Sequence, residues 1–158
     1  MLILDMPARL NPELSELGTG GRAFPAPGVI TASSGSGFTI LLAEDDPKLR
    51  KLACLVLKSA GYFVLPAADG RDAFAQFLDH RQEIDLLVTD FEMPNMDGLQ
   101  LACEVAQLRP ETKILLVSGD SANAGLLAAP WPLLFKPFHP DELVQSVAAA
   151  LESQIAGE

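Results

Sequence analysis

The sequence predicts an α/β domain built on a doubly wound parallel sheet. Short apolar runs alternate along it with segments whose apolar residues recur at helical spacing, which is the pattern of strand–helix–strand units. Three runs, at residues 40–42, 86–88 and 114–117, are apolar without interruption. Such runs are typical of strands that helices bury on both faces. Right-handed crossovers would then place helices on both faces of the sheet.

Each expected element has its own signal. The helical segments carry apolar stripes, Gly61 is placed to end the first helix, and Pro140 is placed to open the last. Only the stretch Ser121–Trp131, which contains Gly125 and Pro130, is expected to form a short or irregular helix. The expected strands are Phe38–Ala43, Tyr62–Leu65, Asp85–Thr89, Lys113–Val117 and Pro132–Phe135, and the stripes are Leu49, Leu52, Ala53, Val56 and Ala60; Ala73, Phe74, Phe77 and Leu78; Leu101, Ala102, Val105 and Leu108; and Leu143, Val144, Val147 and Leu151.

Composition divides the chain near residue 37. Residues 1–37 are rich in Pro, Gly and Ser and have no apolar periodicity, so we expect a flexible leader. Residues 38–152 would form one domain, and 153–158 a short tail. No apolar run reaches the ~18 residues of a membrane span, and the start lacks the basic region of a signal peptide. A cytoplasmic protein without a membrane partner is therefore expected.

Charge and cysteine content narrow the function. With 11 Lys and Arg against 21 Asp and Glu, the net charge is −10. This balance argues against direct binding of nucleic acid, which needs clustered basic residues. Cys54 and Cys103 are not at metal-binding spacing. They are expected to be small buried thiols in a reducing compartment, although the sequence leaves a disulfide open.

Polar residues follow four of the expected strands. Glu44-Asp45-Asp46 follows the first, Asp90 the third, Ser118 the fourth and Lys136 the fifth. Ligands of an open α/β sheet bind at the C-terminal ends of its strands, so these side chains are expected to meet at one edge. Each also has a plainer explanation, as a helix cap, a loop acid or a surface lysine. Their joint occurrence at strand ends favours a shared site.

The residue types at this edge indicate phosphoryl chemistry. Clustered carboxylates repel one another and need a cation. Hard oxygen ligands without histidine or thiolate suit Mg²⁺ or Mn²⁺. A lysine and a hydroxyl opposite them could stabilise a phosphoryl group that is transferred in line onto a carboxylate.

Residues 38–152 resemble the receiver domain of two-component, or histidine–aspartate phosphorelay, signalling. The family is that of the response regulators. The combination of the central acidic segment and the Lys-Pro-Phe triplet is highly specific. The matching segments are Ile40–Asp46 with Arg50, Gly61-Tyr62 leading into Ala68-Asp69-Gly70, Asp85–Gly98, Leu116–Gly119 and Phe135–Phe138.

The resemblance implies a five-stranded, flavodoxin-like sheet of order 2-1-3-4-5 and a set of residue roles. Asp90 would accept a phosphoryl group from the phosphohistidine of a sensor histidine kinase or a histidine phosphotransfer protein. Ser118 would rotate to bond the new group, and Lys136 would neutralise it. Mg²⁺ would be held by Glu44, Asp45, Asp90 and the backbone carbonyl of Glu92, with Asp45 preferred over Glu44 as the direct ligand. Asp46 would cap the helix. Arg50 lies at the family's usual distance from the acidic pair, which identifies that pair as Glu44 and Asp45.

The implied protein is a switch and not an enzyme, apart from its own phosphotransfer and slow autodephosphorylation. No output domain is evident, so it would act as a stand-alone receiver that docks on an unknown effector. Two departures put the usual relay in doubt. Leu133 stands where the family has its switch aromatic, and the segment between Ser118 and Lys136 is short. Trp131 or Phe135 could replace that aromatic, or Ser118 could act directly on the shortened segment Ser121–Pro130.

Three other functions could use a similar sheet. A flavin electron carrier of the same fold would need a Ser/Thr/Gly phosphate loop, where the chain has Glu44-Asp45-Asp46. An aspartate-nucleophile phosphatase would need a second aspartate two residues after Asp90, where Glu92 stands. A receiver-like binding module that is never phosphorylated stays open, although such modules usually lack an acid or the lysine.

Overall fold

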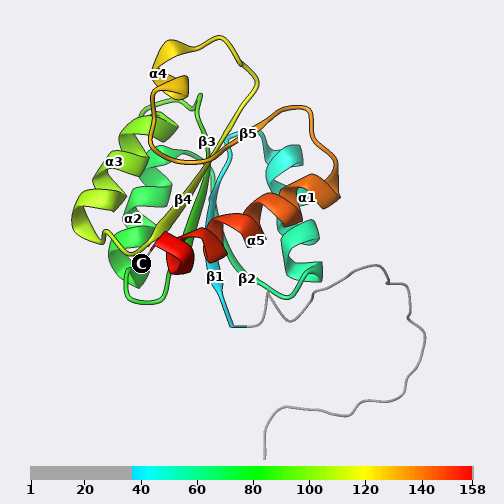
Figure 1. Ribbon diagram of the computed structural model, residues 1–158, viewed down its shortest axis with the longest axis vertical. Helices are drawn as coiled ribbons and strands as arrows, with labels where there is room; N and C mark the ends of the chain where they lie inside the picture. Colours follow the sequence, from blue (N-terminus) through cyan, green and yellow to red (C-terminus); the bar gives the residue numbers. More distant parts are fainter. Residues whose placement is uncertain (1–36, 158) are drawn as a thin grey trace, which may run out of the picture. The chain divides into compact units, whose positions relative to one another are not determined.

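A five-stranded parallel sheet forms the centre of the domain (Figure 1). The computed structural model describes residues 37–157. The strand order, β2-β1-β3-β4-β5, confirms the predicted doubly wound sheet, and each strand lies within two residues of its expected place. The strands are β1 (Thr39–Ala43), β2 (Phe63–Ala67), β3 (Leu86–Asp90), β4 (Lys113–Ser118) and β5 (Leu133–Phe135).

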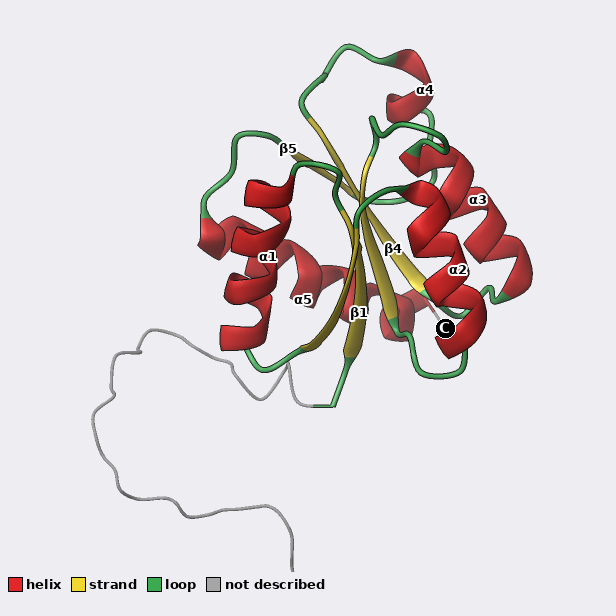
Figure 2. Cartoon of the chain, turned by 180° about the vertical axis from the view of Figure 1, so that it is seen from behind, coloured by secondary structure: helices red, strands yellow, loops and turns green. Residues whose placement is uncertain are grey.

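Helices cover both faces of the sheet, as predicted. α1 and α5 lie on one face, and α2 and α3 lie on the other (Figure 2). The short α4 confirms the expected irregular segment, and α5 extends to Gly157, into the residues expected as a tail. The expected leader, residues 1–37, lies outside the described residues except for Gly37. The helices are α1 (Pro47–Ser59), α2 (Gly70–His80), α3 (Gly98–Leu108), α4 (Ala124–Leu127) and α5 (Pro140–Gly157).

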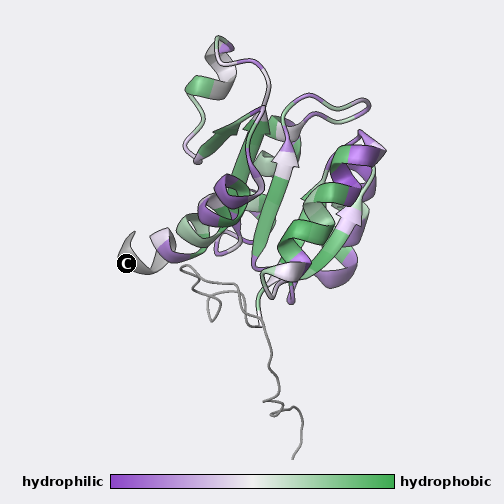
Figure 3. Ribbon diagram, turned by 90° about the vertical axis from the view of Figure 1, so that its right-hand side faces the viewer, coloured by the Kyte–Doolittle hydropathy of each residue, from purple (hydrophilic) through white to green (hydrophobic). Residues whose placement is uncertain are grey.

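The core consists of two apolar layers, one on each face of the sheet. Figure 3 shows that the strands between these layers are mostly hydrophobic. Successive side chains of a strand point to opposite faces. In β1, Ile40 and Leu42 pack towards α1 and α5, whereas Leu41 and Ala43 pack towards α2 and α3. All four are buried, which explains why the run is apolar without alternation.

The first helix departs from its predicted packing. Leu57 is its only fully buried residue, and it lies outside the predicted stripe. Leu49 and Leu52, which belong to that stripe, are 40% and 52% exposed. The expectation of two buried thiols is also wrong in part, because Cys103 is exposed and Cys54 only half-buried. Both are free cysteines. No helix among residues 37–157 combines the length and apolarity that a bilayer crossing requires.

Side-chain hydrogen bonds tie the N-terminal edge of the sheet. The Asp85 carboxylate accepts the backbone N–H of Thr39 at 2.9 Å, which links the starts of β1 and β3. The Arg109 guanidinium, after α3, donates to the carbonyls of Arg81 and Ile84 at 2.6 Å each. Charged donors make such bonds stronger than neutral ones. The connection before β3 is thereby fixed at the edge opposite to the acidic residues.

Candidate functional site

Strand register brings the predicted residues to one edge. Ala43 pairs with Thr89, so Glu44 follows β1 at the level where Asp90 ends β3. Asp90 pairs with Val117, and Ser118 pairs with Phe135. Lys136 follows at once, and its backbone N–H donates to the Ser118 carbonyl at 2.8 Å. The sheet therefore assembles the acids, the hydroxyl and the lysine that the sequence singles out.

Lys136 bridges two carboxylates. Its Nζ lies 3.1 Å from Glu44 Oε2 and 3.1 Å from Asp90 Oδ2. Burial raises the pKa of both carboxyl groups above their usual range, since it disfavours the charged form. Burial alone would lower the pKa of Lys136, but Asp90 and Glu44 outweigh it and the net shift is upward. The ammonium group therefore stays charged and holds the two acids together.

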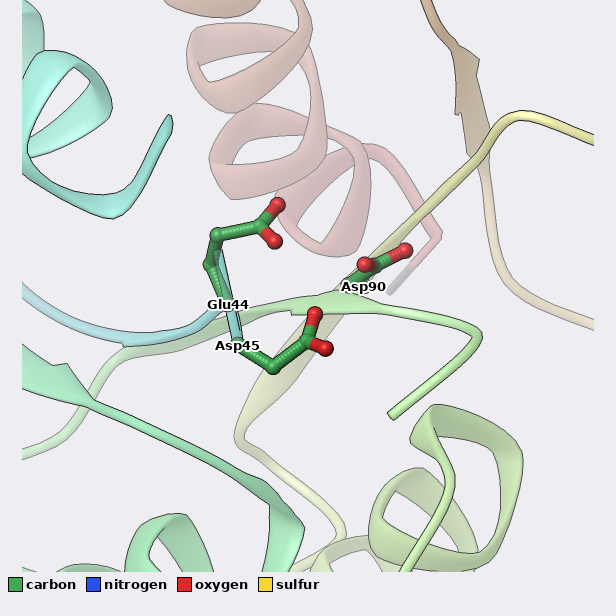
Figure 4. Close-up of side chains that lie close together, drawn as sticks. All are labelled: Glu44, Asp45 and Asp90. Atoms are coloured by element: carbon green, nitrogen blue, oxygen red, sulfur yellow. The ribbon is translucent and has the colours of Figure 1, made fainter. Parts of the chain in front are cut away.

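Glu44, Asp45 and Asp90 form a cluster whose ligand oxygens all lie within 4.8 Å of one another. Figure 4 shows Glu44 and Asp45 projecting from the turn after β1 and Asp90 from the neighbouring strand. Glu44 and Asp90 are buried, and Asp45 is exposed. Three carboxylates against one ammonium group leave an excess negative charge that suits a divalent cation. An all-oxygen donor set with an open side fits Mg²⁺, which keeps several waters.

The turn that carries Glu44 and Asp45 is held by its own helix. Asp46 caps α1, as predicted, and accepts the N–H groups of Lys48 at 2.8 Å and Leu49 at 3.3 Å. The Arg50 guanidinium reaches back to the carbonyls of Glu44 at 2.7 Å and Asp45 at 3.4 Å. In the sequence, Arg50 only helps to identify Glu44 and Asp45 as the acidic pair. In the fold it clamps the backbone of the acidic turn.

The turn after Asp90 lies tightly against the strand end. A side chain at Gly98 would overlap the Asp90 carbonyl oxygen and lie 2.8 Å from Phe91 Cα, so only glycine allows this approach. The Gly98 N–H donates to the Phe91 carbonyl at 2.8 Å. The Glu92 N–H faces the Asp90 carboxylate as a donor. Glu92 thus contacts Asp90 through its amide, while the predicted role of its carbonyl as a metal ligand stays a prediction.

Known proteins with similar sequences and structures belong to one family. Residues 40–148 match the model of the family described as "Response regulator receiver domain". The receiver protein CpdR of Brucella abortus is 35% identical over 116 residues, which cover 71% of this chain and 95% of that protein. The chain belongs to the response regulator receiver domain family. The structural neighbours, with the strand order above, confirm the CheY-like, flavodoxin-like fold.

Other relatives carry the receiver as part of a longer chain. The sensor kinase CckA of Brucella abortus is 36% identical over 128 residues, which are 78% of this chain and 13% of the kinase. The regulatory protein GlrR of Escherichia coli is 33% identical over 72% of this chain and 26% of its own length. The crystal structure of the response regulator TrrA of Thermotoga maritima with Mg²⁺ and beryllofluoride matches at TM-score 0.64, with 31% identity over 72% of this chain and 99% of that one.

Ser118 lies at the end of β4 in this receiver domain and is buried. Its Oγ accepts the Asp120 N–H at 3.0 Å, and the Asp120 carboxylate in turn accepts the Ala122 N–H at 2.9 Å. The hydroxyl therefore holds the turn that leads to α4. Its predicted bond to a phosphoryl group would require this arrangement to change.

The face near β5 differs from the sequence-based expectation in one respect. Trp131 precedes the strand, so a regular strand from Trp131 to Phe135 is not formed. Trp131 and Leu133 are partly buried against the core layer that α2 and α3 cover. Phe135 is 37% exposed. Packing thus accounts for Trp131 and Leu133, and Phe135 is the aromatic that faces solvent.

A cavity of about 220 Å³ opens beside the acidic cluster between α1 and the segment after β5. Leu49, Leu52 and Phe138 are among its apolar walls, and Asp90 and Lys136 border it. The periodicity of α1 indicated an apolar face, but it could not show that part of this face stays uncovered. Likewise, only the folded chain shows the Arg50 clamp and the Glu92 amide.

Proposed function

We propose that this receiver domain is a phosphoacceptor switch in which Asp90 takes a phosphoryl group from a partner's phosphohistidine. The observation that carries the proposal is the position of Lys136 Nζ, 3.1 Å from Asp90 Oδ2, beside a cluster of three acids that fits a divalent cation. A carboxylate at Asp90, a fixed cation and a metal site are the parts that in-line phosphoryl transfer needs.

The chemistry assigns each residue a task. A carboxylate oxygen of Asp90 attacks phosphorus, the bond from phosphorus to the histidine nitrogen breaks, and the imidazole takes up a proton as it leaves. Lys136 and the Glu92 N–H would stabilise charge on the transferred oxygens. Glu44, Asp45 and the Asp90 carboxylate would hold Mg²⁺, which supplies charge neutralisation when bound. Ser118 would then exchange its bond with Asp120 for one to the phosphoryl group.

The proposal makes the chain a switch and not a turnover enzyme. Its product is a new state of its own surface, which an effector protein would recognise. The alternative is a receiver-like binding module that is never phosphorylated. The intact set of Glu44, Asp45, Asp90 and Lys136 favours the phosphoacceptor, because a binding module has no use for buried carboxylates that burial makes costly to ionise.

Intact-mass spectrometry after incubation with acetyl phosphate and Mg²⁺ tests the acceptor. We expect one added phosphoryl group in the wild type, and none in Asp90→Asn or in the presence of EDTA. Asp97→Asn is a matched control, because Asp97 caps α3 and lies outside the cluster. Labelling of Asp90→Asn would overturn the assignment, and an unlabelled wild type would favour the binding module.

The surface of α1 supports a protein donor. Leu49, Leu52 and Leu55 are exposed on it, and Lys48 and Lys51 lie among them on a helix without acids. A donor histidine must approach Asp90 beside this surface, and the cavity next to Asp90 shares Leu49 and Leu52 with it. We propose that a histidine kinase or phosphotransfer protein docks here. Because kinases draw their phosphoryl group from ATP, we place the transfer in the cytoplasm.

Two donors separate docking from chemistry. Leu52→Gln should slow transfer from a phosphorylated kinase or phosphotransfer protein of the same genome, and it should leave the rate with acetyl phosphate unchanged. Leu78→Gln is the matched control, since Leu78 is 47% exposed on α2, on the other face. Equal loss with both donors would show that Leu52 acts on the site and not on docking.

A further inference from the structure

Hydrogen bonds tie the turn between β3 and α3 at both ends, and in its middle Met93 and Met96 pack against the core layer that α2 and α3 cover. At its start, the Phe91 N–H donates to the Val117 carbonyl at 2.7 Å, and at its end the Gly98 N–H donates to the Phe91 carbonyl at 2.8 Å. Between them lies Glu92, whose N–H faces the Asp90 carboxylate. The geometry at Asp90 therefore depends on what holds residues 92–96.

The first turn of α2 also contacts this segment through Asp69 and Gly70. Gly70, the first residue of α2, has no room for a side chain: a Cβ there would overlap the carbonyl oxygen of Met96 and lie 2.8 Å from its Cβ. One residue earlier, Asp69 accepts a hydrogen bond from Asn95 Nδ2 at 3.4 Å. Asn95 has φ of 73°, a left-handed conformation that few residues other than glycine adopt readily. Two adjacent contacts thus join the two segments.

The cap of α2 is itself rigidly built. Asp69 Oδ1 accepts the Asp72 N–H at 2.9 Å, while Asp69 Oδ2 receives the bond from Asn95. The Asp72 carboxylate accepts the N–H of Ala68, the residue before the cap, at 2.9 Å, so both acids hold the start of α2. One aspartate therefore caps the helix and holds the turn at the same time.

We propose that Gly70 and Asp69 are positioning residues for phosphoryl transfer, which set the turn that aims the Glu92 amide at Asp90. The proposal rests on the phosphoacceptor function. Neither residue reaches the reacting atoms. A methyl group at Gly70 must push the Met96 backbone away, because the overlapping atom is a carbonyl oxygen and not the flexible end of a side chain. The displaced turn then carries Glu92 out of line.

The closing experiment compares Gly70→Ala with Ala75→Gly on the same helix. Alanine suits a helix better than glycine, so loss of helical propensity cannot account for a defect in Gly70→Ala. Ala75 is exposed on α2 and makes the opposite exchange without contact to the turn. Initial rates of labelling by acetyl phosphate are measured by intact mass over a range of Mg²⁺ concentrations, together with thermal unfolding.

We expect Gly70→Ala to be labelled roughly tenfold more slowly, with a higher Mg²⁺ concentration for half-maximal rate and a Tm within a few degrees of the wild type. Ala75→Gly should lower Tm and keep the wild-type rate. A wild-type rate and Mg²⁺ dependence in Gly70→Ala would overturn the proposal. The phosphoacceptor function fails separately, if the wild type itself is not labelled or if Asp90→Asn is.

A second variant keeps the test decisive if Gly70→Ala does not fold. Asn95→Gly retains the left-handed backbone and removes only the hydrogen bond to Asp69, at an exposed position. We expect a severalfold slower rate with little change in Tm. A wild-type rate in Asn95→Gly, alongside an unfolded Gly70→Ala, would show that α2 supports the fold and not the chemistry.

Discussion

Lys136 Nζ lies 3.1 Å from a carboxylate oxygen of Glu44 and 3.1 Å from one of Asp90. The two acids come from neighbouring strands, and both are buried. The lysine is therefore the fixed counter-charge of the site, with only 23% of its side chain exposed. Removal of Lys136 leaves both buried carboxylates without their shared donor, which makes the metal-free stability of the domain a sensitive readout.

The lysine is expected to stabilise the metal-free fold. Lys136→Ala should lower the free energy of unfolding by about 1 kcal/mol, because two buried carboxylates lose their shared donor. The change should appear in EDTA by chemical denaturation, and Mg²⁺ should restore part of it. Lys51→Ala, at an exposed position of α1, should change stability by much less. Equal effects of the two substitutions would contradict the assigned pairing.

Asp90→Asn is expected to stabilise the metal-free protein at neutral pH. Burial raises the pKa of Asp90 in the folded state, so the ionised carboxylate costs free energy whenever the pH exceeds that pKa. As the pH falls through the folded pKa, the native state takes up the proton before the unfolded state does. The Tm advantage of Asp90→Asn should therefore be greatest near neutral pH and shrink towards about pH 4, the usual range of an aspartate.

Thermal unfolding in EDTA across this pH range measures the effect. Asp79→Asn serves as the control, because Asp79 is an exposed acid of α2. Saturating Mg²⁺ should reverse the order of stability, since it binds the wild-type cluster more tightly than the variant. A pH-independent Tm difference would mean that titration of Asp90 does not contribute.

Asp45 and Asp46 are adjacent acids with separable tasks. Asp45→Ala should weaken Mg²⁺ binding by tenfold or more, an order-of-magnitude expectation for a lost first ligand, and leave metal-free Tm almost unchanged. Asp46→Ala should cost about 1 kcal/mol as a lost helix cap and keep Mg²⁺ affinity close to the wild type. Calorimetric titration and thermal unfolding of both variants give the comparison. Weakened Mg²⁺ binding in Asp46→Ala alone would reverse the assignment.

The fluorescence of Trp131 is expected to report conformational change near β5. Its ring is partly buried against the layer under α2 and α3, and it is the only tryptophan. Beryllofluoride with Mg²⁺ should change its emission in the wild type and not in Asp90→Asn. Phe135→Leu leaves this change intact if the signal travels through Ser118 and the turn to α4. If calorimetry shows that beryllofluoride and Mg²⁺ bind while the Trp131 emission stays constant, the conformational change does not involve β5.

Periodicity predicted the sheet because its signal is local. Ile40, Leu87 and Ile114 are buried on whichever face they point to, so their runs are apolar without interruption. The same reasoning located Asp90 and Lys136, since strand ends in an α/β sheet carry ligands. It failed for α1, where Leu49 and Leu52 have helical spacing but no neighbour that covers them.

The sequence does not predict contacts between segments that are distant along the chain. The exposure of Cys103 depends on which side of α3 meets the sheet. Gly70 belongs to a recognised motif, yet its reason for being glycine is the carbonyl of Met96, 26 positions later. The spacing of Arg50 predicts only which acids form the metal pair, whereas its hydrogen bonds to the carbonyls of Glu44 and Asp45 depend on the folded turn.

The bonds of Asp85 and Arg109 at the far edge of the sheet have a dynamic consequence. They lock the chain before β3 and at the start of β1, whereas the segments that follow Asp90 and Ser118 are turns outside the strands. Rearrangement at the acidic edge is then a local opening, with a free energy below that of global unfolding. We therefore expect the acidic edge to rearrange while amide hydrogens at the opposite edge remain protected from exchange with solvent.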